Sequence, residues 1–298
     1  MTETKCGFVA VLGASNVGKS TLVNSLVGAK ISIVSPKVQT TRSRVRGIVM
    51  EENTQIILVD VPGIFKPKRR LDRAMVMTAW TEAKDADIRL LLIDAKRGLD
   101  ADSQSIIDTL IKEKQKAVLV INKIDLIDKK KLLPLVEKLK SFPVFTDTFF
   151  ISAAKGDGTK ELLSYLSQNL PEGAFMFDPD DLSDLPNRLF AAEITREKLF
   201  LNLQQELPYS VAVETNAFET KDNGDIRIEQ TIYVERQGQK AIVIGKKGQM
   251  LKKIGEAARY ELTRIFEHPV HLFLFVKVKE NWVNDPDRYQ EWGLDFNV

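Results

Sequence analysis

The chain has 298 residues, of which 44% are hydrophobic and 28% charged, and its formal net charge is +2. This length suits two ordinary domains, and the near-neutral charge excludes a uniformly basic protein, so any nucleic-acid surface must come from local clustering. Cys6 is the single cysteine, which excludes an intrachain disulfide, and no apolar run is long enough to span a membrane. We therefore expect a cytoplasmic globular protein.

Short apolar runs alternate with turns and helical stretches through residues 1–171. These runs are rich in Val, Ile and Leu without polar alternation, as in strands that are buried on both faces of a parallel sheet. They are Phe8–Leu12, Ile56–Val59, Ile88–Ile93, Val118–Ile121 and Phe149–Ile151, with Val45–Met50 as a strand paired with Ile56–Val59. The pattern predicts an α/β domain with a mostly parallel, doubly wound sheet.

A different order of elements follows a proline-containing, acidic stretch. Residues 172–187 include Asp178, Asp180, Asp181 and Asp184, and we expect an irregular linker there. Beyond it the pattern predicts a helix over Leu189–Leu203, strands at Ser210–Thr215 and Ile226–Glu235, a glycine-bounded turn, a helix over Gln249–Phe266 and a strand at Val270–Lys279. This order predicts a smaller α+β domain over residues 188–298.

The first motif with a clear chemistry lies between the first predicted strand and the first predicted helix. It reads Gly13-Ala14-Ser15-Asn16-Val17-Gly18-Lys19-Ser20-Thr21 and matches GxxxxGK[ST]. In such a loop, backbone N–H groups and the positive end of the helix dipole converge on phosphate groups. We expect Lys19 to reach the β- and γ-phosphates and the Ser20 hydroxyl to ligate Mg²⁺.

A second motif, Asp60-Val61-Pro62-Gly63, follows the strand Ile56–Val59. The Asp60 carboxylate can hold Mg²⁺ through water, and the Gly63 N–H can meet the γ-phosphate. The next residue is Ile64, at the place where Ras-like GTPases carry a water-orienting glutamine. Since an isoleucine side chain forms no hydrogen bond, we expect slow intrinsic hydrolysis.

Two basic segments lie where loops that sense the nucleotide are expected, Lys37–Arg46 and Ile64–Arg73. A threonine in the first segment can close on Mg²⁺ when a γ-phosphate is present. Thr41 is the first choice and Thr40 the second. Lys19, Thr41 and Gly63 are thus the residues expected to act during hydrolysis.

A third motif, Asn122-Lys123-Ile124-Asp125, indicates which base is bound. Asp125 can accept two hydrogen bonds from guanine that adenine does not offer, and a carboxylate left unpaired is costly. Lys123 can lay its aliphatic stem along the base, and Asn122 can bond N7. Backbone N–H groups of Ser152 and Ala153 can meet guanine O6. The three motifs together predict a site for GTP or GDP.

The second predicted domain carries Gly245-Lys246-Lys247-Gly248 between an apolar segment and a helix. GxxG in this setting is typical of KH domains, in which it contacts a nucleic-acid backbone. Basic residues outnumber acidic ones around it by seven to two between positions 240 and 265, and they include Lys252 and Lys253. We expect these six residues to contact RNA.

The sequences GASNVGKS, QTTR, DVPG, NKID, SAAKG, ELPYS and VIGKKG resemble those of the Era GTPase family over the whole chain. The resemblance implies a Ras-like G domain and a type II KH domain that binds 16S ribosomal RNA near its 3′ end during assembly of the 30S subunit. It implies a monomer, peripheral contact with the bacterial inner membrane, and a potassium ion at Asn16 that assists hydrolysis. Ala14-Ser15 and Val61 depart from common family residues, but neither position offers an essential side chain to the nucleotide.

Two alternatives remain at this point. The second domain could dock a protein partner, as in a membrane-associated regulatory GTPase. The chain could also be a metabolic enzyme driven by a nucleoside triphosphate, which is disfavoured because the second domain lacks a cluster of candidate catalytic residues.

Overall fold

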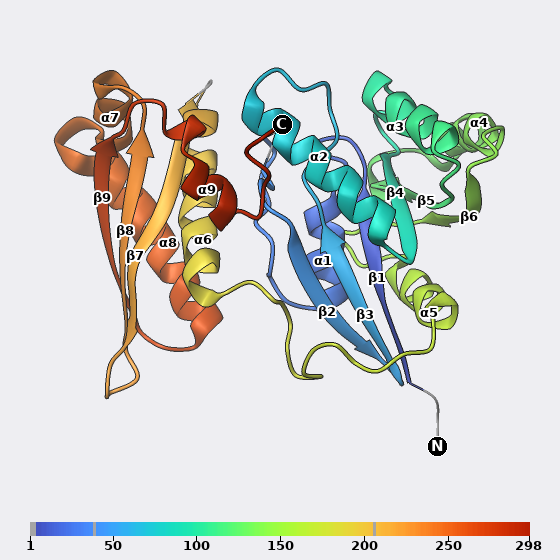
Figure 1. The fold of residues 1–298 in the computed structure, drawn as a ribbon, viewed down its shortest axis with the longest axis horizontal. Coiled ribbons are helices and arrows are strands. Elements are labelled where there is room, and N and C mark those ends of the chain that lie inside the picture. The colour runs from blue at the N-terminus through green and yellow to red at the C-terminus, as the bar shows by residue number, and fades with distance from the viewer. Residues whose placement is uncertain (1–3, 38–39, 205–206) are drawn as a thin grey trace. The chain divides into compact units, whose positions relative to one another are not determined.

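The structure is a computed structural model that describes residues 4–37, 40–204 and 207–298. Gln39 and Glu206, which belong to two of the family motifs, lie outside these ranges. The chain forms two compact units (Figure 1). The first comprises the residues up to Ser32, Thr41–Asp184 and Tyr289–Val298, and the second comprises Ile33–Thr40 and Leu185–Arg288. In the described ranges, no helix is both long enough and apolar enough to cross a membrane.

The first unit is built on a six-stranded sheet in the order β2-β3-β1-β4-β5-β6. Its strands are β1 (Lys5–Leu12), β2 (Val45–Glu51), β3 (Thr54–Asp60), β4 (Ile88–Asp94), β5 (Ala117–Asn122) and β6 (Phe145–Phe150). β2 pairs antiparallel with β3, and the other pairs are parallel. This confirms the mostly parallel sheet. β6 begins before the predicted run Phe149–Ile151, because an edge strand with partly exposed residues has no continuous apolar run.

Helices cover both faces of this sheet, which explains the unbroken apolar runs. Leu90, Leu91 and Leu92 are consecutive and each 0% exposed, so both faces of β4 are buried. Residues from α2 (Arg70–Asp85), α3 (Ala101–Lys112) and α4 (Lys129–Lys140) share one core cluster on one face. On the other face, α1 (Lys19–Val27) and α5 (Thr159–Asn169) pack together and against β3 (Figure 1). The loops that follow the parallel strands therefore meet at one edge of the sheet.

The second unit has a three-stranded sheet in the order β7-β8-β9. Its elements are α6 (Asn187–Asn202), β7 (Val211–Thr220), β8 (Ile226–Val234), α7 (Gln237–Ile244), α8 (Gln249–Phe266) and β9 (Val270–Val278), with α9 (Pro286–Glu291) after them. β7 and β8 are antiparallel, whereas β8 and β9 are parallel. Leu199 of α6, Ile232 of β8 and Ile254 of α8 are 0% exposed in a shared core, which confirms the α+β domain.

α7 corrects one prediction, the turn expected between the strand ending at Glu235 and the helix starting at Gln249. This helix has eight residues, and at its start Gln239 Oε1 accepts from the backbone N–H groups of Glu235 and Arg236 at 2.8 and 3.0 Å. A glycine at position 238 and the short length hide it from a periodicity argument, since two turns give too few apolar repeats.

Residues 172–184 lie with the first unit, and a buried glutamine bonds the middle of this segment. Gln55 of β3 is 0% exposed. Its Oε1 accepts from the backbone N–H groups of Met176 and Phe177 at 2.8 and 3.0 Å, and its Nε2 donates to the Phe177 carbonyl at 2.9 Å. The compact units divide the chain between Asp184 and Leu185, inside the predicted linker of residues 172–187.

The second unit includes Ile33–Thr40, which comes from within the sequence of the first. The Val34 N–H donates to Glu197 Oε1 at 2.8 Å, and Arg196 Nη2 donates to the Thr40 carbonyl at 2.5 Å. Lys37 Nζ donates to the carbonyls of Phe200 and Leu203 near the end of α6. Polar contacts with α6 thus hold this segment.

The first unit includes Tyr289–Val298. The Arg70 guanidinium lies 4.5 Å from the centroid of the Phe296 ring, and Arg73 Nη2 donates to the Val298 carbonyl at 3.3 Å. Cation–π and hydrogen-bond contacts therefore hold this segment to α2.

Replacing Gln55 with leucine should loosen the attachment of residues 176 and 177 to the sheet, while the ends of the segment stay bonded to β1 and β2. Gln55→Leu keeps the side-chain volume similar but leaves backbone groups of residues 176 and 177 without partners. We expect the free energy of unfolding to fall by about 2–3 kcal/mol, measured by urea denaturation, with faster proteolysis near Phe177.

Gln104→Leu on α3 is the matched control, because its partly exposed side chain bonds across the surface of its own helix, to Asp108. Its effect should stay within about 0.5 kcal/mol. Equal stability of the two variants would contradict the anchoring role of Gln55.

Candidate functional site

The loop between β1 and α1 has its backbone carbonyls turned toward side-chain donors. Lys19 Nζ donates to the carbonyls of Gly13 and Ala14 at 3.1 and 3.0 Å, and Lys123 Nζ donates to that of Asn16 at 2.6 Å. Because a trans peptide points its C=O and N–H in opposite directions, the N–H after an outward carbonyl faces into the loop. This is the arrangement that an anion-binding loop needs.

Asn122 joins this loop to two others. The side chain is 1% exposed, and its Nδ2 donates to the Val17 carbonyl at 2.9 Å. Its Oδ1 accepts from the N–H groups of Lys123 and Ala153 at 2.8 and 3.0 Å. A Cβ at Gly18, where φ is +101°, would lie 2.4 Å from Asn122 Nδ2, so only glycine allows this approach. The loops after β1, β5 and β6 are thereby fixed together.

Two residues that the sequence analysis missed belong to the same place. Asp94, at the end of β4, accepts from Lys123 Nζ at 2.7 Å. Arg97, in the loop after it, donates from Nη1 to the Ser15 carbonyl at 2.6 Å. Neither falls in a motif used above; the position of Asp94 at the end of a buried parallel strand is the only signal for it.

A candidate cation site lies at the start of α1. Ser20 Oγ and Thr41 Oγ1 are 3.0 Å apart, and Thr41 Oγ1 lies 3.5 Å from Asp60 Oδ2. Asp60 is fully buried, and its Oδ1 has no hydrogen-bond partner among the described residues. Such a buried, unpartnered carboxylate oxygen fits a divalent cation that prefers oxygen ligands.

Burial disfavours the charged forms of Lys19 and Asp60, and the opposite charges of these two groups partly offset that effect. Burial lowers the pKa of Lys19 to about 8, although the nearby Asp60 raises it and Arg97 lowers it further. Burial likewise raises the pKa of the Asp60 carboxyl, against the hydrogen bond from Ser20 and the charge of Lys19. A phosphate beside Lys19 and a cation beside Asp60 would each favour the charged form.

The two candidate threonines are placed differently. Thr41 lies beside Ser20 and Asp60, as described above. The Thr40 hydroxyl instead donates to the Lys37 carbonyl at 2.8 Å and lies 2.9 Å from Ser35 Oγ, within the second unit. This geometry favours Thr41, the first choice from the sequence.

The loop after β6, which was expected to contact guanine through backbone N–H groups, uses those groups for bonds within the protein. Ser152 Oγ donates to Asp125 Oδ1 at 2.7 Å, which orients the carboxylate. The backbone N–H of Ser152 is bonded to the Asp157 carbonyl at 3.0 Å, and that of Ala153 is bonded to Asn122 Oδ1. Both N–H groups, which were expected to meet guanine O6, thus hold the loop in shape. The sequence predicts a role only for the backbone of Ser152, whereas the structure adds this one for its hydroxyl.

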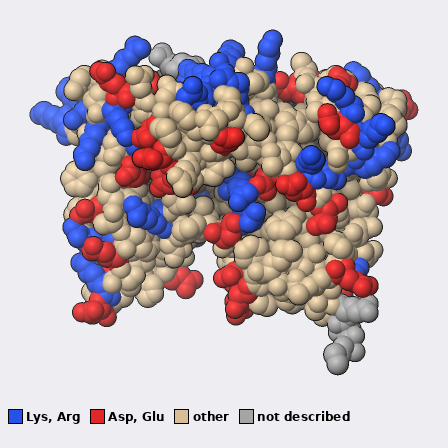
Figure 2. All heavy atoms as spheres, in the orientation of Figure 1, with Lys and Arg blue, Asp and Glu red and all other residues tan. Residues whose placement is uncertain are grey.

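The second unit places its GxxG segment at the start of α8. Gly245 has φ 72°, Lys247 has φ 51°, and the Gly248 N–H donates to the Gly245 carbonyl at 3.1 Å, which makes a tight turn. Lys246 and Lys247 are exposed. Lysine and arginine side chains gather over this end of the second unit, near the label α7 of Figure 1 (Figure 2).

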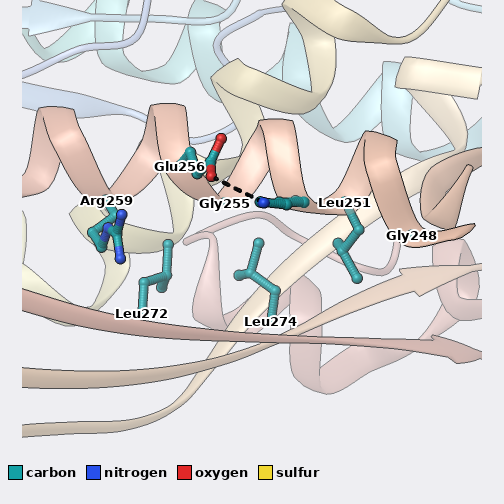
Figure 3. A pocket seen from close by; sticks show the side chains of 8 residues that line it. Gly248, Leu251, Gly255, Glu256, Arg259, Leu272 and Leu274 are labelled. Atoms are coloured by element: carbon teal, nitrogen blue, oxygen red, sulfur yellow. Dashed lines mark ion pairs between the residues drawn. The ribbon is translucent and has the colours of Figure 1, made fainter.

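A groove of about 450 Å³ runs beside this turn, between α8 and β9 (Figure 3). Leu272 and Leu274 point from β9 toward α8 and form an apolar floor (Figure 3). The helix side is lined by Gly248, Leu251, Lys252, Gly255, Glu256 and Arg259. Lys252 Nζ lies 3.9 Å from Glu256 Oε1. An apolar floor with charged edges suits a flat base and its phosphate backbone.

Only one of the two α8 lysines predicted to contact RNA lines the groove. Lys252 lines the groove, whereas Lys253 is exposed on α8 and is not among the lining residues. Arg259 lines it although the sequence analysis did not select it as a site residue. Its spacing of four residues from Gly255 on the helix is the signal that could have found it.

Comparisons with known proteins agree with both units. A family model described as 50S ribosome-binding GTPase matches residues 8–123, and one described as KH domain matches residues 206–283. A GTPase Era of Brucella suis biovar 1 is 56% identical over 295 residues, which cover 99% of this chain and 95% of that protein. A GTPase Era of Mesorhizobium japonicum is 57% identical over 293 residues, covering 98% and 94%.

Two solved structures are similar over nearly the whole chain. One is a crystal structure of Era in complex with MgGDPNP and nucleotides 1506–1542 of 16S ribosomal RNA. The other is an Aquifex aeolicus Era variant bound to GDP.AlF4⁻. Each has a TM-score of 0.91 and 43% identity and covers 97% of this chain and 99% of its own. With its two units, its phosphate loop and these relatives, the chain belongs to the Era family of GTPases.

Proposed function

We propose that the first unit holds GTP or GDP with Mg²⁺ at the loops joined by Asn122. The phosphates lie against the N–H groups of residues 13–21, with Lys19 beside the terminal phosphates. Mg²⁺ is held by the hydroxyls of Ser20 and Thr41 and, through water, by Asp60. Residues 61–63 close on the γ-phosphate side. The unpartnered, buried Asp60 Oδ1 carries the metal assignment, and the magnesium nucleotide bound by the Era relative supports it.

Guanine is recognised by Asp125, which Ser152 and Lys155 orient. Asp125→Asn should lose GTP and gain xanthosine triphosphate, because the amide can donate to the O2 atom that replaces the guanine amine. We expect the preference to change by about 10⁴-fold, measured by competition binding with both nucleotides. An unchanged preference for GTP would contradict the assignment.

Hydrolysis by the protein alone is slow in this proposal. Ile64 is buried in the core with Val59 and Ala83, and its N–H donates to the Gly13 carbonyl at 3.2 Å. Its side chain therefore cannot orient water in the place of the glutamine of Ras-like proteins. We propose that a potassium ion ligated by Asn16 compensates in part by placing positive charge at the phosphates.

Hydrolysis should then be faster in potassium than in sodium. Asn16 has φ 64°, so Asn16→Gly removes the side chain without straining the backbone. The variant should hydrolyse GTP equally fast in both salts, at about the wild-type rate in sodium, and still bind GDP. Equal wild-type rates in the two salts would show that potassium has no role.

The second unit, we propose, binds 16S ribosomal RNA near its 3′ end, and the protein acts in assembly of the 30S subunit. The groove beside the GxxG turn carries this proposal, and the RNA fragment bound by the Era relative supports it. Its apolar floor accepts bases, while Lys246, Lys247, Lys252 and Lys253 face the backbone. The protein then works as a cytoplasmic monomer with peripheral contact with the inner membrane.

Reversing charge at the turn should weaken RNA binding while GTP binding stays normal. Lys246→Asp with Lys247→Asp removes the positive charges nearest the backbone, and aspartate tolerates the left-handed φ at position 247. Affinity for a single-stranded oligonucleotide of the rRNA 3′ end should fall by at least about tenfold, with a smaller salt dependence. Fluorescence anisotropy across a salt series measures both quantities.

The matched control is Lys112→Asp with Lys114→Asp, which makes the same charge change at exposed positions of the first unit. RNA affinity equal to wild type in the Lys246 and Lys247 double variant would favour the alternative, a second domain that docks a protein partner.

A further inference from the structure

The Ser15 carbonyl is the remaining outward carbonyl of the phosphate loop, and its donor is Arg97. The distance from Arg97 Nη1 to the Ser15 oxygen is 2.6 Å. Lys19, Lys123 and Asn122, which hold the neighbouring carbonyls, belong to the motifs found in the sequence. Arg97 belongs to none of them, although it completes the same pattern.

The loop that carries Arg97 is built to hold the guanidinium in place. Asp94 Oδ1 accepts from the N–H groups of Lys96 and Arg97 at 2.8 and 3.3 Å. On the other side, Arg97 Nη2 forms an ion pair with Asp100. Asp100 in turn caps α3, since its Oδ1 accepts from the Ser103 N–H at 2.8 Å. The backbone of Arg97 is thus held at the end of β4, and its guanidinium is paired at the start of α3.

The hydrogen bond from Arg97 to the Ser15 carbonyl also affects the N–H group of the same peptide. The Ser15 C=O and the Asn16 N–H belong to one planar trans peptide and point in opposite directions. Holding the carbonyl toward Arg97 therefore holds the Asn16 N–H on the opposite side, toward the inside of the loop. A hydrogen bond from a cation to the carbonyl polarises the peptide and makes its N–H a stronger donor.

We propose that Arg97 is a positioning residue for GTP hydrolysis, which acts on the phosphates through the Ser15–Asn16 peptide. During hydrolysis, water forms a bond to the γ-phosphorus and gives up a proton, which the released phosphate carries, and the bond from that phosphorus to the β-phosphate oxygen breaks. Negative charge therefore passes to GDP, and a polarised N–H in the loop stabilises that charge more in the transition state than in the bound substrate. The inference rests on the proposed placement of GTP in this loop.

Arg97→Ala should therefore lower the single-turnover rate at saturating GTP by about tenfold, less than the loss of a direct oxyanion donor. The dissociation constants of GTP and GDP should change by less than about threefold. Arg97→Lys should keep part of the rate, and guanidinium chloride at about 10 mM should restore part of it to Arg97→Ala, compared with tetramethylammonium chloride at equal concentration.

Lys96→Ala is the matched control, because it removes a positive charge from the neighbouring exposed position of the same loop. It should hydrolyse GTP at the wild-type rate and gain nothing from guanidinium. Equal rates for Arg97→Ala and Lys96→Ala would overturn the proposal. So would an unchanged rate with weaker binding of GTP and GDP alike, because Arg97 would then merely support the loop. If the wild type bound no guanine nucleotide, the proposed function itself would fail, which binding alone reveals.

Discussion

The functional edge of the first unit depends on one buried amide, that of Asn122. Its donor and acceptor atoms are satisfied by the phosphate loop, its own loop and the loop after β6. An amide carries both a donor and an acceptor, so it can join segments that each present a different backbone group. The loop between β1 and α1 and the loops after β5 and β6 are therefore held by the same side chain, and none of them can move without breaking bonds in a place shielded from water.

Charge is distributed around that edge in a consistent way. Lys19, Lys123 and Arg97 all donate to carbonyls of the phosphate loop. Asp94 pairs with Lys123 and Asp100 pairs with Arg97, so each carboxylate offsets the positive charge of its partner. The loop thus meets an anionic ligand with N–H groups that are already aligned and polarised, so little reorganisation is needed on binding. Burial of Asp60 leaves one carboxylate oxygen in the same pocket that a cation can satisfy.

Much of this was predictable because the constraints are local. The phosphate loop, Asp60 and the Asn122–Asp125 motif are short segments whose spacing is dictated by a single ligand, and the structure brings them together. Arg97 and Asp94 were missed because their role depends on the neighbour relation of β1 and β4, which no single segment contains. The backbone bonds of Ser152 and Ala153 likewise depend on how the loop after β6 folds. The turn expected in place of α7 reflects the weak periodicity of a two-turn helix.

Each compact unit includes a segment that is remote from the rest of it in sequence, which matters for the design of truncated fragments. Ile33–Thr40 belongs to the second unit and Tyr289–Val298 to the first, so neither unit is a continuous stretch of sequence. A fragment cut after Asp184 would lack the aromatic residues that pack on Arg42 and Arg70, Trp292 and Phe296. A fragment that starts at Leu185 would lack Val34 and Thr40, whose backbone groups bond Glu197 and Arg196. Either fragment would therefore lack a segment of its own unit. Nucleotide and RNA binding are best measured on the 298-residue chain, which contains these segments.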